Sequence, residues 1–352
     1  PAALVNAARR ASMRPGRTGK REWAAPAFTS TPSLHYFVTP RTFPMILVLT
    51  GGTGGAKLVE GLAALIDPAE LTIVCNTGDD CVFHGLYISP DIDTITYTLA
   101  GLNDTEKGWG LKGDTFAALE QLRRLGNDAW FNLGDKDLAT HIARTRLRNE
   151  GRKLSEITDQ LRRALGVSAT ILPMSDDRIE TRVETPQGEI SFQEFFVKER
   201  STPEVFAVHL AGADKSRPAP GVLGAIREAD AIVICPSNPV TSIGPILAVP
   251  GIRTALEKSE APIIGVTPIV GKVAITGPAH KLMRACGLES SPLGVAKAYR
   301  QFLNMLVIAR EDRAIVPQIE TLGVKAVCAD IRMNSLADKK RLAGEVLALV
   351  GK

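Results

Sequence analysis

The chain has 352 residues, of which 45% are hydrophobic and 23% charged, a composition typical of a globular protein with one large α/β domain or two smaller ones. Its net charge of +4 comes from residues 1–44, which hold seven of the 42 basic residues but one of the 38 acidic residues. The rest is close to neutral. This excludes a broad nucleic-acid surface, and no apolar run reaches the roughly 18 residues that a membrane span needs.

Residues 1–44 have no sustained helical or strand period and are rich in Ala, Arg, Pro, Ser and Thr. The composition vaguely resembles a transit peptide, but it indicates a disordered extension or a stretch translated upstream of a start at Met45. We therefore expect a single domain over residues 45–352.

The cysteine content favours a reducing compartment. There are five cysteines, an odd number, and no C-x-x-C pair occurs. This pattern predicts free thiols in a cytoplasmic protein, without a disulfide framework or a zinc site.

Strand and helix patterns alternate along most of the chain. Apolar runs typical of buried parallel strands occur at 45–50, 71–76, 205–210, 231–236, 262–269, 305–310 and 325–330. Helical stretches are expected at 56–66, 115–125, 137–149, 155–165, 221–229, 251–259, 293–303 and 336–350. The alternation predicts an α/β fold with a Rossmann-like, doubly wound, mostly parallel sheet.

The region 137–200 breaks this alternation. Two helical stretches are followed at 169–200 by period-2 alternation around T-P-Q-G, which is typical of an antiparallel hairpin. We expect an inserted helical and small antiparallel β subdomain here.

A glycine-rich turn follows the first predicted strand, in the sequence MILVLTGGTGGAKL. Four glycines around Thr53 (Gly51, Gly52, Gly54 and Gly55) let backbone N–H groups approach an anion, and the helix expected to start near Ala56 adds its N-terminal dipole. Lys57 adds a positive charge. A tight turn without a ligand is the alternative. A Walker A pattern fails at Leu58, and a dinucleotide fingerprint fails at Lys57, so the turn indicates phosphate binding without favouring NAD.

Carboxylates gather soon after this turn. Asp79 and Asp80 follow the second strand, and Asp91 and Asp93 lie two apart in S-P-D-I-D-T, where an extended segment would project both to one side. Carboxylates beside a phosphate would repel it unless a divalent cation intervened, and Mg²⁺ prefers such oxygen ligands. Local turns and helix caps are the alternatives.

Later motifs offer further polar groups. Lys136 lies in L-G-D-K-D, where Asp135 can alternatively act as a helix cap. Trp109 can stack on an aromatic ligand or belong to the core, and the histidines read as structural, with His84 as the exception. A Pro-rich loop after the strand at 231–236 supplies candidate nucleotide or phosphate ligands, or alternatively only caps its own turns: Ser237, Asn238, Thr241 and Ser242.

Taken in order, these motifs resemble the 2-phospho-L-lactate transferase family, which makes the deazaflavin coenzyme F-420. The resemblance extends from Met45 to the C-terminus. It rests on these segments: GGTGGAKL, NTGDD, SPDIDT, GWGLKGDTF, LGDKDLATH, PMSDD, PSNPVTSIGPIL, GPAHKLM and LGV. Some members of the family carry Thr and Pro after GGTG, so the loop of this chain departs mildly from the pattern.

The resemblance implies a Mg²⁺-dependent, homodimeric enzyme. The enzyme would transfer a phospholactyl-type group from a guanosine-diphosphate-linked donor to the deazaflavin alcohol Fo and release GMP. Asp93 and Lys136 would contact Fo, and the 51–55 loop and the 237–242 segment would hold the guanosine diphosphate. We expect Asp80 and Asp91 to hold the metal, and Asp93 or Asp91 to accept the hydroxyl proton.

Two other classes are weighed against this interpretation. A non-enzymatic, UDP-sugar-binding regulator of the related gluconeogenesis-factor family would not need the paired SPDIDT and GDKD segments. An NAD-dependent oxidoreductase would need an acidic ribose ligand where the second strand ends at Asn76. The sequence does not distinguish phospholactate, phosphoenolpyruvate and 3-phosphoglycerate as the acid of the donor.

Overall fold

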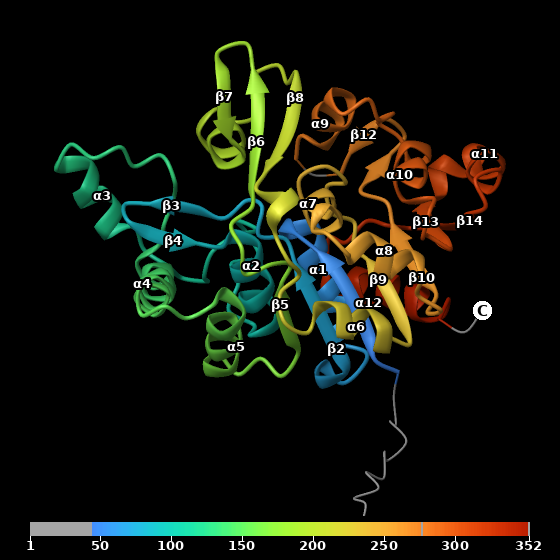
Figure 1. Cartoon of the computed structure of the whole chain (residues 1–352), viewed down its shortest axis with the longest axis horizontal. Coiled ribbons are helices and arrows are strands. Elements are labelled where there is room, and N and C mark those ends of the chain that lie inside the picture. The colour runs from blue at the N-terminus through green and yellow to red at the C-terminus, as the bar shows by residue number, and fades with distance from the viewer. Residues whose placement is uncertain (1–43, 276, 351–352) are drawn as a thin grey trace, which may run out of the picture. The chain divides into compact units, whose positions relative to one another are not determined.

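Seven parallel strands form the central sheet of the computed structural model, which describes residues 44–275 and 277–350 (Figure 1). In spatial order they are β14 (Lys325–Ala329), β13 (Met305–Ala309), β10 (Ile263–Val266), β9 (Ala231–Ile234), β1 (Ile46–Thr50), β2 (Leu71–Cys75) and β5 (Thr170–Pro173). Chain order reverses between β1 and β9, as it does in doubly wound nucleotide-binding sheets. The predicted Rossmann-like α/β fold is confirmed. The extension expected at 1–44 lies almost wholly outside the described residues.

Strand β1 shows how the sheet is buried on both faces. All five of its residues are buried and apolar apart from Thr50, and alternate side chains enter different cores. Ile46 and Val48 belong to one core, whereas Leu47 and Leu49 belong to the other. Burial of both faces explains why the sequence of the strand is a continuous apolar run rather than an alternating one.

Helices cover both faces of the sheet (Figure 1). The core that contains Ile46 is shared with α1 (Gly52–Ala63), α2 (Pro90–Leu99), α5 (Leu154–Ala164) and α12 (Leu336–Leu347). The core that contains Leu47 is shared with α6 (Val222–Glu228), α7 (Ile243–Ala248), α8 (Ile252–Glu257), α9 (Ala279–Ala285), α10 (Pro292–Tyr299) and α11 (Val316–Glu320). Helix α1 packs against both α2 and α12 and follows β1, so it starts at the carboxyl end of an inner strand of the sheet.

Two excursions of the chain leave the sheet. The first, between β2 and β5, contains the hairpin of β3 (Cys81–Phe83) and β4 (Leu86–Ile88), and also α2, α3 (Ala117–Arg124), α4 (Asp135–Asn149) and α5. The second, between β5 and β9, contains a three-stranded antiparallel sheet of β6 (Glu180–Thr185), β7 (Gly188–Ser191) and β8 (Ala207–Ala211). A further hairpin pairs β11 (Ile269–Val270) with β12 (Val273–Ala274).

The excursions differ from the single insertion expected at 137–200. The helical pair and the antiparallel sheet are present, but β5 lies between them and pairs with β2 in the central sheet. The apolar run at 205–210 contributes β8 to the antiparallel sheet instead of a strand to the parallel one. Strand β5 has four residues and ends in proline, so its sequence has too little periodicity to be recognised as a strand. The sequence alone therefore does not distinguish one insertion from two excursions.

Two helix starts also differ from expectation. Helix α1 begins at Gly52 rather than near Ala56, so the glycines lie in its first turn. The segment S-P-D-I-D-T opens α2 with Pro90 at its first position, and is helical rather than extended. Ser, Pro and acidic residues in this order are a helix-start signal, because proline favours the first helical position and carboxylates complement the dipole.

All five cysteines are free, as predicted. Within the described residues, no helix combines the length and the apolar character needed to cross a membrane.

Candidate active site

The loops after β1 and β9 meet at the point where the strand order reverses. Ser237 Oγ donates to the carbonyl oxygen of Gly51 at 2.8 Å, and the N–H of Gly51 points back at Ser237 Oγ at 3.2 Å. Ligands of open α/β sheets bind beyond the carboxyl ends of the strands at this point. The structure therefore brings together the two segments that the sequence assigned to phosphate and nucleotide.

Glycine is required in this turn because other groups approach its backbone closely. A Cβ on Gly51 would lie 2.5 Å from Asp91 Oδ2 and 2.8 Å from Ser242 Cβ. A Cβ on Gly55 would collide with Thr50 Oγ1 and lie 2.7 Å from Ser237 Oγ. Gly52 has a φ of +67°, which L side chains rarely adopt.

The start of α1 has four backbone N–H groups without a partner inside the helix, and two of them are taken by side chains. Gly51 N–H faces Ser237, and Gly52 N–H donates to Asp91 Oδ1 at 2.7 Å. Among the described residues, the N–H groups of Thr53 and Gly54 have no such acceptor. Two donors and the positive end of the helix dipole are therefore available to an anion.

Asp91 and Asp93 point to different partners because they lie two residues apart in a helix. Asp91 accepts from Gly52 N–H and, at 2.9 Å, from the side-chain amide of Asn76. Burial raises the pKa of Asp91 to about 6, although these hydrogen bonds oppose the shift. Asp93 turns toward α4. The expectation that both project to one side is wrong, since it assumed an extended segment.

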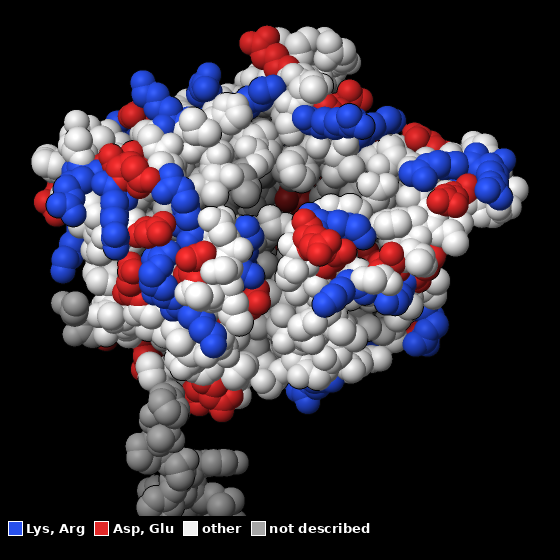
Figure 2. Space-filling model, turned by 180° about the vertical axis from the view of Figure 1, so that it is seen from behind, with Lys and Arg blue, Asp and Glu red and all other residues white. Residues whose placement is uncertain are grey.

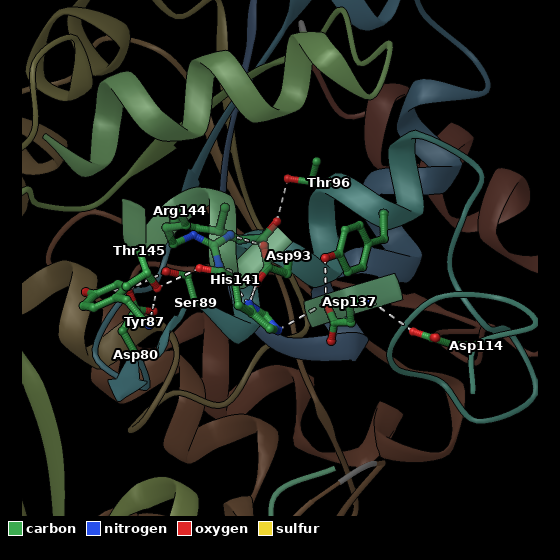
Figure 3. Close-up of polar contacts among 12 residues, drawn as sticks. Asp80, Tyr87, Ser89, Asp93, Thr96, Asp114, Asp137, His141, Arg144 and Thr145 are labelled. Atoms are coloured by element: carbon green, nitrogen blue, oxygen red, sulfur yellow. Dashed lines mark hydrogen bonds and ion pairs between the residues drawn. The ribbon is translucent and has the colours of Figure 1, made fainter. Parts of the chain in front are cut away.

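Asp93 belongs to a buried polar network between α2 and α4 (Figure 3). Arg144, which is 1% exposed, forms a two-pronged ion pair with Asp93, with Nη1 at 3.0 Å from Oδ2. His141 lies between two carboxylates, 3.7 Å from Asp93 and 3.3 Å from Asp137. The Tyr97 hydroxyl donates to Asp137 at 2.6 Å. Burial alone would raise the pKa of Asp137, but the hydrogen bond and charge of His141 hold it below its ordinary value.

Lys136 lies at the start of α4 but does not contact Asp93. Its ammonium donates to the carbonyl oxygens of Lys112 at 3.2 Å and Gly113 at 2.9 Å. Asp135 does not cap α4 either, because its carboxylate accepts from the backbone N–H groups that start α3. Asp114 supplies the cap of α4 instead. Through these hydrogen bonds Lys136 stabilises the loop that precedes α3.

Asp79 and Asp80 each carry a carboxylate oxygen, Oδ1 in both, that is buried and lacks a hydrogen-bond partner among the described residues. Asp80 Oδ2 accepts from Ser89 at 2.8 Å and from Tyr87 at 3.0 Å (Figure 3). Burial raises the pKa of Asp80 to about 8. Burial and the charge of Asp91 raise the pKa of Asp79 well above its ordinary value. Among the described residues neither carboxylate forms an ion pair, although the charge of Arg144 partly offsets the effect of burial on the pKa of Asp80.

These orphaned oxygens make Asp79 a further candidate to hold a magnesium ion, beside the predicted Asp80 and Asp91. Hard oxygen donors suit Mg²⁺, which commonly takes one or two carboxylates and completes its shell with phosphate and water. Each oxygen of Asp91 accepts one hydrogen bond and keeps a further lone pair, whereas Oδ1 of Asp79 and Oδ1 of Asp80 have no partner among the described residues. No group of three or more metal-ligating side chains is arranged for a metal within residues 44–275 and 277–350.

The loop after β9 is only partly available to a ligand. Asn238 Oδ1 accepts from the backbone N–H groups of Val240 at 3.0 Å and Thr241 at 3.4 Å, so it caps its own turn. Thr241 is 1% exposed and its carbonyl oxygen accepts from Asn76. Ser237 is bonded to Gly51, and Ser242 packs beside it. Asn238 therefore caps its own turn, which is the alternative to ligand binding that the sequence left open. Ser237 instead holds the glycine turn in place.

Two cavities border the first turns of α1. The larger, about 430 Å³, is lined by Gly54, Lys57, Pro236, Val270, Val273, Ala274, Ile275, Ile331, Arg332, Met333 and Asn334. The smaller, about 120 Å³, is lined by Thr53, Ala56, Lys57, Glu60, Thr94, Tyr97, Thr98, Asn103, Thr105, Gly108, Trp109, Gly110, Met333, Asn334 and Lys339. The space-filling view from behind shows a hollow near the centre of that face, with acidic atoms in its depth (Figure 2).

Sequence reasoning missed several residues of this region. No sequence motif assigns a functional role to Asn76, Arg144 or the segment 331–334, and the spacing of His141 predicts only a structural role. Asn76 carries a usable signal, since it ends a strand that precedes the acidic cluster. The pairing of Arg144 with Asp93 spans 51 positions and has no local sequence signal.

Comparisons with known proteins agree with the motifs. A sequence model described as "2-phospho-L-lactate transferase CofD" matches residues 46–343. A 2-phospho-L-lactate transferase of Methanosarcina acetivorans is 43% identical over 304 residues, covering 86% of this chain and 98% of the relative. A phosphoenolpyruvate transferase of Streptomyces griseus is 42% identical over 310 residues, which cover 86% of this chain and 97% of the relative.

A solved structure agrees with the fold. A UPF0052 family protein of Bacillus halodurans superposes with a TM-score of 0.56 at 19% identity, covering 86% of this chain and 98% of that protein. The resemblance drawn from the motifs is confirmed, and a transferase activity of the 2-phospho-L-lactate type is supported. The chain belongs to the 2-phospho-L-lactate transferase CofD family.

Proposed function

We propose that the protein transfers a phospholactyl-type group from a guanosine-diphosphate-linked donor to the terminal ribityl hydroxyl of Fo and releases GMP, in coenzyme F-420 biosynthesis. The observation that carries the proposal is the start of α1 at the β1–β9 switch point, where the N–H groups of Thr53 and Gly54 have no acceptor among the described residues. An anion bound there lies next to the carboxylate of Asp91, which is bonded to Gly52.

The reaction is a displacement at phosphorus. The hydroxyl oxygen of the acceptor forms a bond to the phosphorus that carries the acid, and the bond from that phosphorus to the bridging oxygen of GMP breaks. The hydroxyl proton passes to a carboxylate, and GMP leaves with the electron pair of the broken bond. Catalysis then depends on positioning the reactants in line and on neutralising phosphate charge.

Asp91 is the carboxylate that we assign as the base. It is fixed beside the phosphate-binding turn by Gly52 and Asn76, and its raised pKa of about 6 brings it closer to the pH at which a base works well. Asp93, the other predicted base, is held in the ion pair with Arg144. We retain Asp93 and Lys136 as contacts of Fo. Binding would exchange part of their present hydrogen bonds for contacts with the acceptor.

Magnesium is the cofactor that we propose. Asp79 and Asp80 would hold it through the oxygens that lack partners, and the bound ion would neutralise phosphate charge. We further propose a cytoplasmic homodimer, on the family resemblance and the five free cysteines. Light scattering of the purified chain measures the oligomeric state directly.

The acid of the donor has two candidates among the relatives. Proteins named 2-phospho-L-lactate transferase and phosphoenolpyruvate transferase are 43% and 42% identical to this chain, so identity favours neither. A donor with 3-phosphoglycerate is the third candidate. The mechanism is the same for all three because the attacked phosphorus is the same.

GMP release tests the proposal. The full chain is incubated with Fo, Mg²⁺ and the guanosine-diphosphate-linked phospholactate, enolpyruvyl phosphate or phosphoglycerate, and nucleotides are separated by chromatography. We expect Fo-dependent GMP with at least one donor. Tight binding of a UDP-sugar without GMP release from any donor would support the regulator alternative instead.

A further inference from the structure

The two cavities beside α1 are neighbours that share part of their linings. Their linings have only Lys57, Met333 and Asn334 in common. Of these three side chains, only that of Lys57 carries a positive charge. It lies on the second turn of α1, just beyond Thr53, which lines the smaller cavity, and Gly54, which lines the larger.

Lys57 differs from the other basic residues of these linings in having no acidic partner among the residues that the structure describes. Lys339, in the smaller cavity, pairs with Glu60 at 2.6 Å. Arg332, in the larger cavity, pairs with Glu311 at 2.5 Å. Within the described part of the chain, Lys57 forms neither an ion pair nor a side-chain hydrogen bond, although it is half-buried. An unpaired, partly desolvated ammonium is most readily satisfied by an anion from a ligand.

The chemistry of the two linings matches the two substrates of the proposed reaction. The larger cavity has apolar walls, including Val273 and Ile275, which are 68% and 42% exposed and suit the flat face of a nucleoside base. The smaller cavity presents hydroxyl and amide groups, among them Thr94, Thr98 and Asn103, which suit a polyol chain.

On this basis, which rests on the proposed function, we propose that Lys57 is a catalytic residue. The nucleoside of the donor occupies the larger cavity and the ribityl end of the acceptor enters the smaller one. The phosphorus under attack then lies at the shared part of the linings, where the Lys57 ammonium donates to one of its non-bridging oxygens. As the acceptor oxygen bonds to phosphorus and the bond to GMP breaks, Lys57 neutralises the charge on the group in transfer.

The test separates kcat from KM in the full chain. Lys57→Met removes the charge and keeps much of the stem, Lys57→Arg keeps a charge, and Lys258→Met, at the exposed end of α8, is the matched control. We expect Lys57→Met to lower kcat by roughly 10²–10³-fold, the range for loss of one transition-state donor, with each KM changed by less than about threefold. Lys57→Arg should recover part of kcat, and Lys258→Met should match the unchanged chain.

Each other outcome is decisive. A Lys57→Met kcat equal to that of the unchanged chain overturns the proposal, as does a higher donor KM at constant kcat, which would place Lys57 on the nucleotide alone. If Lys57→Met does not fold, a folded Lys57→Arg without any activity also overturns it, because arginine keeps the positive charge on which the proposal depends. Whatever the Lys57 variants do, turnover by the unchanged chain still supports the proposed function. No turnover by the unchanged chain refutes that function and this role together.

Discussion

Asp91 Oδ1 lies 2.7 Å from the backbone nitrogen of Gly52, so a carboxylate from α2 accepts one of the free N–H groups at the start of α1. Its second oxygen accepts from Asn76 at the end of β2. Three elements that bound the proposed phosphate site are thereby joined through one side chain. The carboxylate is held beside the proposed anion site without occupying the N–H groups of Thr53 and Gly54.

Asp91→Asn should abolish most of the activity while leaving the chain folded. The amide cannot accept the hydroxyl proton, and loss of a general base costs about 10²–10⁴-fold in kcat. Asp159→Asn on α5 is the matched control, because Asp159 pairs with Arg162 and Arg163 away from the site. Steady-state GMP release measures both variants. Near-normal turnover by Asp91→Asn would remove Asp91 from the role of base.

Arg144→Met should destabilise the protein severely, because it leaves Asp93 buried without its cation. Breaking one side of a buried ion pair costs about 3–5 kcal/mol of unfolding free energy. Arg146→Met is the matched change two positions along the same helix. Its partner Glu150 is half-exposed at 49%, so the expected cost is below about 1 kcal/mol. Urea denaturation measures the unfolding free energy of both variants. Equal losses in Arg144→Met and Arg146→Met would show that the Asp93–Arg144 pair does not stabilise the fold.

Two glycines at the α1–α12 contact should respond in opposite directions to alanine. A Cβ on Gly61 would meet the backbone carbonyl of Lys339, with the carbonyl carbon at 2.6 Å, so Gly61→Ala should destabilise by pushing the helices apart. A Cβ on Gly344 would lie 3.7 Å from Leu65 Cδ1, an ordinary contact. Gly344→Ala should therefore stabilise by about 0.5–1 kcal/mol. Thermal melting of both variants tests the packing of α1, and a stabilising Gly61→Ala would contradict it.

The stability supplied by Asp137 should depend on pH. Because His141 lowers the folded-state pKa of Asp137 below its unfolded value, the stabilisation is present above the unfolded pKa, near 4, and is lost as pH falls through the folded pKa. Asp137→Asn should cost about 2 kcal/mol at pH 7, the scale of a hydrogen bond to a charged group. The difference from the unchanged chain should shrink as pH falls below about 4. Urea midpoints between pH 7 and pH 3 measure it, and a constant difference would contradict the assignment.

The sequence predicted most of the central sheet because its strands are buried on both faces and appear as uninterrupted apolar runs. It also placed the glycine turn and the Ser237 loop at one end of the sheet, since carboxyl ends of parallel strands converge there. It missed β5, whose four residues carry no distinctive period. It mistook the start of α2 for an extended segment, although Ser89 and Pro90 carry a helix-start signal.

Contacts between distant segments were beyond sequence reasoning. The pairing of Asp93 with Arg144, and the engagement of Lys136 by carbonyl groups of its neighbouring loop, depend on how α2, α3 and α4 pack. No local pattern encodes that packing. These contacts change the interpretation of the site, since Asp91 is the carboxylate bonded to the glycine turn while Asp93 has a buried partner.

The most direct test of the central claim is the mass of the product formed on Fo. The full chain is incubated with Fo and Mg²⁺, and the phospholactyl, enolpyruvyl phosphate and phosphoglyceryl donors are supplied in separate reactions. The account predicts a phosphodiester of Fo whose mass matches the acid of one donor, formed together with an equal amount of GMP. Unchanged Fo with every donor, from protein that binds guanosine diphosphate, would contradict the account.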